Sequence, residues 1–319
     1  MERVTPHGTT GITLGDPAGI GPEIVAATLA AAPIEWRERI IVYGDREPLE
    51  RGARAIGVTL PDVAILGDGT GATVEPGHPS ECGGAAQVGY LEAAVAAAKR
   101  GELSAIATAP ISKTWAKRAG FAFPGHTEML AERFGADHVV MLFAGPRMKV
   151  ALATIHVPLA DVARTLSTQG LRKTIELLAQ SCTRDFGIAA PRIGVVGLNP
   201  HAGEGGLLGH EDGAIIAPAL VEALPPARLF GPLIPDVAFR DALDGKYDAL
   251  VAMYHDQGLI PVKLVDFEEA VNVTLGLPIV RTSPDHGTAY DIAGKGIART
   301  VSMQRALSLA IEMAARRAR

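Results

Sequence analysis

The sequence predicts an α/β protein with a mostly parallel sheet, and three observations indicate that class. Short, nearly continuous apolar runs recur along the chain, for example at 193–198 and 249–253, and such runs are typical of strands covered on both faces. Helix-like segments, such as 81–100, separate many of these runs. Two apolar runs at 139–143 and 149–155 flank a short turn, which predicts a hairpin and therefore a second domain or subdomain.

Composition excludes several classes of protein. The chain has 319 residues, of which 48% are hydrophobic and 20% charged, so it can bury the core of one large domain or two ordinary ones. A net charge of −5 argues against a nucleic-acid-binding protein. Cys82 and Cys182 form no C-x-x-C motif, and a reducing cytoplasm is the expected compartment. Residues 1–10 contain no signal core, and no apolar run is long enough to cross a membrane.

The remaining predicted elements begin with a strand at 12–14. The glycine-rich loop 15–23 follows it and leads into a helix at 24–32, with Pro22 and Glu23 suited to the first turn. The glycines at 15, 19 and 21 do not fit the dinucleotide fingerprint, so a tight turn and an anion-binding role both stay open, and no cofactor-binding residue is assigned. Further strands are predicted at 40–43, 62–66 and 104–108, and further helices end at Phe134 or span 171–182 and 300–316. The apolar segment 275–280 leads into Arg281.

Three histidines stand directly after predicted strands. His156 follows the run 149–155, His201 follows 193–198, and His255 follows 249–253. Open α/β sheets hold ligands at the carboxyl ends of strands, and neutral imidazole is a common ligand of zinc and similar ions. The pattern predicts a catalytic metal site, although a satisfied histidine at a capped strand end gives the same local sequence. After the last of these strands, Gly258 predicts a tight turn or a close approach of the backbone.

Seven motifs follow one another along the chain from Gly11 to about Ala298. They are Gly-Asp-Pro-Ala-Gly-Ile-Gly-Pro-Glu at 15–23, Gly-His-Thr-Glu at 125–128, Asn-Pro-His-Ala-Gly-Glu at 199–204, Tyr-His-Asp-Gln-Gly at 254–258, Asn-Val-Thr-Leu-Gly-Leu-Pro at 272–278, Arg-Thr-Ser at 281–283 and Asp-His-Gly-Thr at 285–288. Together they resemble the 4-hydroxythreonine-4-phosphate dehydrogenase family. The resemblance implies a fold like isocitrate and isopropylmalate dehydrogenases, with two α/β domains and the active site in the cleft between them. Domain 1 would comprise 1–125 plus 272–319, and domain 2, with the histidines, 126–271.

The resemblance also implies an activity in vitamin B6 biosynthesis. The family oxidises 4-(phosphooxy)-L-threonine with NAD or NADP, and the product loses carbon dioxide to leave 3-amino-2-oxopropyl phosphate. The partners expected are therefore this small anionic substrate and a second copy of the chain, with no nucleic acid and no membrane. In the implied homodimer the metal site is shared, with His156 and His201 from one chain and His255 from its partner.

Site residues carry over from the family onto matching positions. His156, His201 and His255 would hold one divalent ion, which could be zinc, magnesium, cobalt or manganese. The substrate contacts would be His126, Thr127, Lys263, Asn272 and Arg281. Arg281 and Lys263 suit the phosphate and carboxylate ends of the substrate.

The catalytic residues expected are His255, Asp256 and Lys263, and the group that takes the hydroxyl proton is open between Asp256 and Asp236. Three other functions remain open. One is a dehydrogenase of 4-phospho-threonate or 4-phospho-erythronate, the second is a metal-dependent hydrolase or lyase without nicotinamide, and the third is a non-catalytic binding protein. Reduction of added NAD separates the dehydrogenases from the others.

Overall fold

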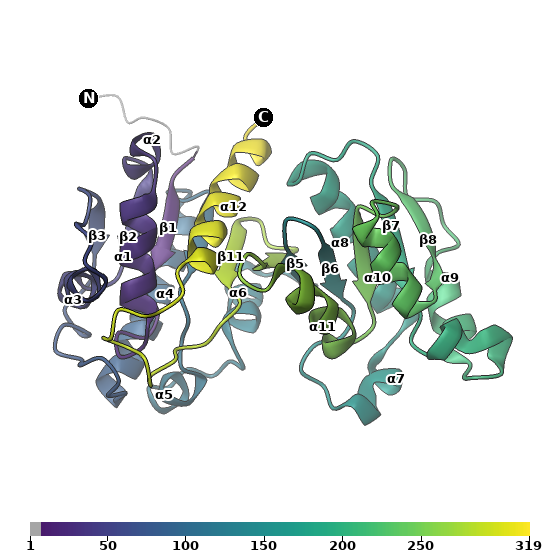
Figure 1. Cartoon of the computed structure of the whole chain (residues 1–319), viewed down its shortest axis with the longest axis horizontal. Helices are drawn as coiled ribbons and strands as arrows, with labels where there is room; N and C mark the ends of the chain where they lie inside the picture. The colour runs from purple at the N-terminus through teal and green to yellow at the C-terminus, as the bar shows by residue number, and fades with distance from the viewer. Residues whose placement is uncertain (1–7) are drawn as a thin grey trace. The chain divides into compact units, whose positions relative to one another are not determined.

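The computed structural model describes residues 8–319, which divide into two compact units. The first unit comprises the described residues up to Asp137 together with Leu277–Arg319, and the second comprises His138–Gly276. The limits that we predicted at 125/126 and 271/272 lie somewhat earlier in the chain. His126 and Thr127 therefore belong to the first unit, whereas the three predicted metal histidines belong to the second. Figure 1 labels the elements of each unit.

Five parallel strands form the sheet of the first unit, in the order β3-β2-β1-β4-β11. Their bounds are β1 (Thr10–Thr13), β2 (Ile40–Tyr43), β3 (Ala64–Leu66), β4 (Ala105–Thr108) and β11 (Val280–Pro284). Every residue of β1, β4 and β11 is buried, which confirms the parallel, doubly covered strands that the apolar runs predicted. The apolar segment 275–280 connects two strands.

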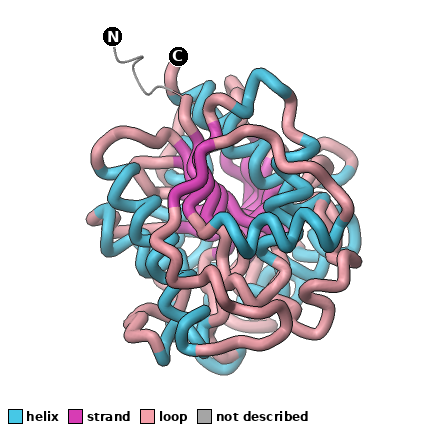
Figure 2. Tube along the Cα trace, turned by 90° about the vertical axis from the view of Figure 1, so that its left-hand side faces the viewer, coloured by secondary structure: helices cyan, strands magenta, loops and turns pink. Residues whose placement is uncertain are grey.

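Helices cover the sheet of the first unit, whose strands are drawn in magenta among cyan helices in Figure 2. They are α1 (Gly21–Ala31), α2 (Ile34–Arg37), α3 (Arg46–Ile56), α4 (Glu81–Lys99), α5 (Lys113–Arg118), α6 (His126–Phe134) and α12 (Val301–Arg317). Gly52 lets α3 approach α1 closely, since a Cβ there would lie 2.5 Å from the backbone of Pro22. None of the helices in residues 8–319 is long and apolar enough to span a bilayer.

Six strands form the sheet of the second unit, in the order β10-β5-β6-β9-β7-β8. Their bounds are β5 (Val140–Ala144), β6 (Lys149–Leu152), β7 (Arg192–Val196), β8 (Arg228–Leu233), β9 (Ala249–Ala252) and β10 (Val271–Leu275). The β5–β6 pair is antiparallel, which confirms the predicted hairpin, and β6, β9, β7 and β8 run parallel. Strand β8 was not predicted, because Gly231 and Pro232 interrupt its apolar residues and none of its residues is buried.

The helices of the second unit include two that matter for the site. Helix α11 (His255–Asp266) begins at one of the predicted metal histidines, and α10 (Pro235–Leu243) carries Asp236 in its first turn. The others are α7 (Val162–Thr165), α8 (Thr168–Arg184) and α9 (Ala217–Ala219), with 3-10 turns at Leu159–Asp161 and Pro200–Gly206 and a π-helical turn at Asp212–Ile216.

The sequence indicated why a glycine stands at position 258 but not which element contains it. It lies inside α11 and makes no tight turn, so that part of the prediction is wrong. A Cβ at this position would lie 2.7 Å from Leu152 of β6, and the glycine therefore permits the close approach that was the alternative.

Candidate active site

Two of the three predicted metal histidines meet within one chain. The ring centroids of His156 and His255 are 5.9 Å apart. The two residues follow β6 and β9, which are neighbouring parallel strands, so both side chains come from the same edge of the sheet. Two imidazoles on one tetrahedral ion, with metal–nitrogen bonds of about 2.0–2.1 Å, have centroids about 5 Å apart. The observed spacing is close to that of a pair of ligands.

The two rings line a cavity of about 400 Å³ in the second unit. Its polar lining consists of both histidines with Thr154, Tyr254 and Asp256, and its apolar lining of Ile155, Val157, Leu159 and Val162. An apolar wall beside a few convergent polar groups is the usual composition of a small-molecule site.

Asp256 fixes the orientation of His255. Its Oδ1 lies 2.6 Å from Nδ1 of the imidazole, so a protonated Nδ1 donates to the carboxylate and Nε2 is left to face a ligand. Carboxylates commonly hold metal-binding histidines in this way. Gln257 accepts from the Met253 amide at 2.6 Å and donates to the Gly197 carbonyl at 2.7 Å, which ties the start of α11 to the ends of β9 and β7. Gln257 was not among the site residues predicted from the sequence.

His201 is not grouped with the other two histidines. It lies in the turn Pro200–Gly206, and within residues 8–319 no cluster of three histidine, cysteine or acidic side chains is placed to hold a metal. The ring contact within one chain joins His156 to His255, although the resemblance assigned these two to different chains.

The backbone at two of the histidines is strained. His156 has φ 46° and His201 φ 53°, in the left-handed region that side chains with a Cβ disfavour. Only five non-glycine residues of the described chain have positive φ, and the others are Ala202, Glu204 and Ala289. Each such residue costs about 1–3 kcal/mol and persists where the surroundings enforce it, often at functional sites. Independently of the ring contact, this strain favours a functional role for the two loops.

A second cluster lies in the first unit, around Arg281 of β11. This side chain is 3% exposed, and its Nη2 donates to Thr108 Oγ1 at 2.8 Å. Burial lowers the pKa of Arg281 to about 10, so it stays charged at neutral pH. Burial, with the charges of Arg281 and Lys113, lowers the pKa of His126 well below its usual value. Within the described chain, the enclosed Nε2 of His126 has no hydrogen-bond partner.

Lys113 and the start of α6 complete this cluster. Helix α6 begins after Gly125 with no side-chain cap, so the amides of its first turn face outward. The Nζ of Lys113 lies 4.0 Å from the point where a Cβ on Gly125 would stand. The Glu128 carboxylate, in the first turn of α6, lies 3.3 Å from the same point and partly offsets these charges. The two cations exceed it by one charge, and with the uncapped helix start they favour an anion. Lys113 was not predicted as a site residue. The one feature of the sequence that could have identified it is its position shortly after the carboxyl end of a strand.

The other predicted substrate residues lie in different surroundings. Thr127 is buried in the first turn of α6. Lys263 is half-buried on α11, and Asn272 on β10 has an enclosed Oδ1 without a hydrogen-bond partner in residues 8–319. Asp236 is exposed on α10 and does not line the histidine cavity, whereas Asp256 does.

The glycine-rich loop 15–23 is packed against its own chain. Asp16 accepts from the Ala18 amide at 2.9 Å and from the Tyr290 hydroxyl at 2.5 Å, and burial raises its pKa. The Glu23 carboxylate accepts from the amides of Gly294 and Gly296. The carboxylates of Asp16 and Glu23 therefore bind the segment 288–296 of the same chain. In that role they do not repel or orient a ligand.

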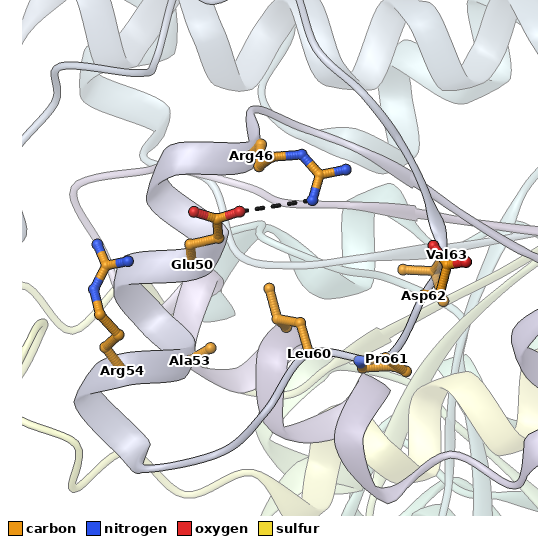
Figure 3. A pocket seen from close by; sticks show the side chains of 8 residues that line it. All are labelled: Arg46, Glu50, Ala53, Arg54, Leu60, Pro61, Asp62 and Val63. Atoms are coloured by element: carbon orange, nitrogen blue, oxygen red, sulfur yellow. Dashed lines mark ion pairs between the residues drawn. The ribbon is translucent and has the colours of Figure 1, made fainter.

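A further cavity of about 410 Å³ lies between α3 and the segment 60–63 (Figure 3). Its Arg46 and Glu50 form an ion pair at 3.6 Å. Opposite charges neutralise each other there, and no predicted site residue lines it, so we assign it no role.

The fold and the two clusters are typical of an α/β enzyme that acts on small molecules. Paired imidazoles lie in one unit and a cationic cluster lies in the other. A family model described as pyridoxal phosphate biosynthetic protein PdxA matches residues 35–310. The 4-hydroxythreonine-4-phosphate dehydrogenase of Desulfosudis oleivorans is 44% identical, over 98% of this chain and 98% of that one. The chain belongs to the PdxA family, which confirms the resemblance.

Solved structures agree with this assignment. The 4-hydroxythreonine-4-phosphate dehydrogenase of Klebsiella pneumoniae superposes with a TM-score of 0.85 at 34% identity, over 98% of this chain and 99% of that one. A terephthalate 1,2-cis-dihydrodiol dehydrogenase of Burkholderia xenovorans gives 0.69 at 30% identity, over 95% of this chain and 97% of that one. The α/β fold class that we predicted is confirmed.

Proposed function

We propose that this protein oxidises 4-(phosphooxy)-L-threonine with NAD or NADP, and that decarboxylation follows to give 3-amino-2-oxopropyl phosphate for pyridoxal 5'-phosphate biosynthesis. The observation that carries the proposal is family membership over nearly the whole chain, with every predicted site residue present. The cavity that contains His156 and His255 supports it, because it offers ligand groups beside an apolar wall.

A divalent ion held by His156, His201 and His255 is part of the proposal. Imidazole donors suit zinc and cobalt best, manganese binds them more weakly, and magnesium prefers oxygen ligands. Such an ion supplies Lewis acidity, which favours loss of a hydroxyl proton. The protein itself would orient the metal ligands. Asp256 orients His255 through the 2.6 Å contact, and strained turns hold His156 and His201. We therefore assign Asp256 an orienting role.

The ring contact supports one division of the ligands between subunits. We infer a homodimer in which His156 and His255 come from one subunit and His201 from its partner, since the first two already neighbour each other. An apolar stripe on α11 supports an interface close to His255. Ile260, Leu264 and Phe267 are 59%, 81% and 62% exposed and recur at helical spacing. Two-fold pairing would then create two equivalent sites.

The cationic cluster is the proposed binding site for the anionic end of the substrate. We propose that Arg281, Lys113, Thr127 and the start of α6 bind phosphate or carboxylate, with neutral His126 as a hydrogen-bonding group. A guanidinium with a second cation matches the double charge of a phosphate. Lys263 and Asn272 remain proposed contacts to the rest of the substrate.

Turnover with a panel of substrates tests the function. The purified protein is supplied with NAD or NADP and with 4-(phosphooxy)-L-threonine, 4-phospho-threonate or 4-phospho-erythronate, and reduced nicotinamide is recorded by absorbance. The first substrate should give the highest kcat/KM. A higher value with another substrate would reassign the physiological reaction, and product release without nicotinamide reduction would favour the hydrolase or lyase alternative.

A further inference from the structure

Asp212 lies at the base of the loop that carries His201. Its side chain is 2% exposed and opens the π-helical turn Asp212–Ile216. Its Oδ1 accepts from the Leu198 amide at 2.8 Å. Its Oδ2 accepts from the Asn199 amide at 3.2 Å and from Asn199 Nδ2 at 2.8 Å. One buried carboxylate therefore receives three hydrogen bonds from the two residues with which the loop begins.

The loop also wraps closely around this carboxylate. A Cβ at Gly197 would lie 2.7 Å from Oδ1 of Asp212, and one at Gly203 would lie 3.2 Å from Oδ2. Between these two glycines stands His201, in a run of left-handed residues that extends to Gly205. Asp212 is thus close to the chain on both sides of the histidine.

A run of left-handed residues needs interactions that hold it. His201, Ala202 and Glu204 each carry a Cβ at positive φ, so a relaxed chain would leave this conformation and move the imidazole. Hydrogen bonds to a carboxylate are about twice as strong as neutral ones and offset such strain well. The three bonds to Asp212 supply this stabilisation at the start of the loop.

We propose that Asp212 is a positioning residue for the metal, which acts through the backbone of the His201 loop. The proposal rests on the proposed function in one respect, namely that His201 is a metal ligand. It differs from the usual support of a metal histidine, in which a carboxylate accepts directly from the imidazole, as Asp256 does for His255.

The test is the binding of cobalt(II) to metal-free protein, measured by calorimetry and by the visible absorption of the bound ion. Asp212→Asn keeps the size of the side chain but turns one acceptor into a donor that faces the Asn199 amide. The dissociation constant should rise by about 10- to 100-fold, as for other outer-sphere partners of metal ligands. The absorption spectrum should also shift toward that of His201→Ala protein.

Asp266→Asn is the matched control. Asp266 is 6% exposed, lies in the same unit, and accepts from the amides of Arg147 and Met148 at 3.2 and 3.1 Å, which anchors the β5–β6 turn. That turn carries no predicted ligand. Asp266→Asn should lower the urea midpoint to a similar extent as Asp212→Asn, and it should leave the cobalt dissociation constant within twofold of wild type.

The outcomes separate this inference from the proposed function. If Asp212→Asn and Asp266→Asn change cobalt binding equally, Asp212 is only a fold anchor and the inference is overturned. If His201→Ala binds cobalt like the wild type, the metal role of His201 itself is wrong, and the inference is lost with it. Should Asp212→Asn not fold, Asn199→Ala removes the side-chain bond to Asp212, together with a 2.8 Å bond from the same amide to Glu211, and spares the two backbone bonds to Asp212. Unchanged cobalt affinity in that variant would also overturn the inference.

Discussion

The two clusters of the proposed site are built in opposite ways. Arg281 and Thr108 stand on buried strands, and His126 and Thr127 open a regular helix, so the cationic cluster is held by ordinary secondary structure within one chain. In the histidine cluster, His156 and His201 stand on turns at positive φ, His255 opens helix α11, and His201 lies apart from the other two. We infer that the proposed anion site relies on a rigid scaffold, whereas the proposed metal site relies on two strained turns and a second subunit.

Metal removal should have the largest effect, because it acts on the histidine cluster alone. Treatment with a chelator should abolish turnover, and zinc, cobalt or manganese should restore it. Binding of inorganic phosphate to the cationic cluster, followed by calorimetry, should survive the same treatment, because that cluster is complete without the ion. Full turnover by rigorously metal-free protein would contradict the proposed metal role.

Mixing inactive variants sharpens the comparison by asking which histidines share a subunit. In His156→Ala mixed with His201→Ala, one site of each heterodimer takes His156 and His255 from the second chain and His201 from the first, so it is intact. Random exchange makes half of the dimers mixed, and activity should return to roughly a quarter of wild type by symmetry.

The mixture of His156→Ala with His255→Ala is the matched control. No intact site forms in it if both residues come from the same subunit, so no activity should return. The division implied by the family resemblance predicts the reverse, with recovery in this second mixture. Recovery in neither mixture, with subunit exchange verified, would rule out a shared site altogether.

Substitutions in the cationic cluster should have smaller effects and a different kinetic signature. Arg281→Ala should raise KM by about 10- to 100-fold, since a charged hydrogen bond contributes about 1.5–3 kcal/mol. Lys113→Ala should raise it less, because this lysine is not buried on a strand. His255→Ala should instead lower kcat. Steady-state kinetics over a wide range of substrate concentration would show whether the two clusters are reversed in role, as a KM effect at His255 would imply.

The same contrast explains what the sequence could predict. Apolar runs such as 249–253 identified buried strands and the strand end located His255, because burial on both faces leaves a clear pattern. Arg281 lies inside β11 and was assigned only through the family resemblance. The start of α11 reads as a loop in the sequence because it contains Gly258 and Pro261, yet it forms a helix that packs on β6. Lys113, Gln257 and Asp212 were missed because their roles depend on hydrogen bonds and contacts to residues distant in sequence, which no local pattern records.

The smallest predicted effect is a pH dependence of stability due to His126. Burial and the charges of Arg281 and Lys113 lower its pKa in the folded protein, whereas the unfolded chain has the ordinary value of about 6.5. The unfolded state therefore binds more protons below that value, and stability falls as the pH drops through it. At pH 5.5, one unit below the unfolded value, the loss should be on the order of 1 kcal/mol. Urea unfolding at pH 7.5 and 5.5 measures this loss against His126→Gln, which cannot titrate. The wild type should lose more stability than the variant, and equal losses would mean that His126 is not held neutral by its surroundings.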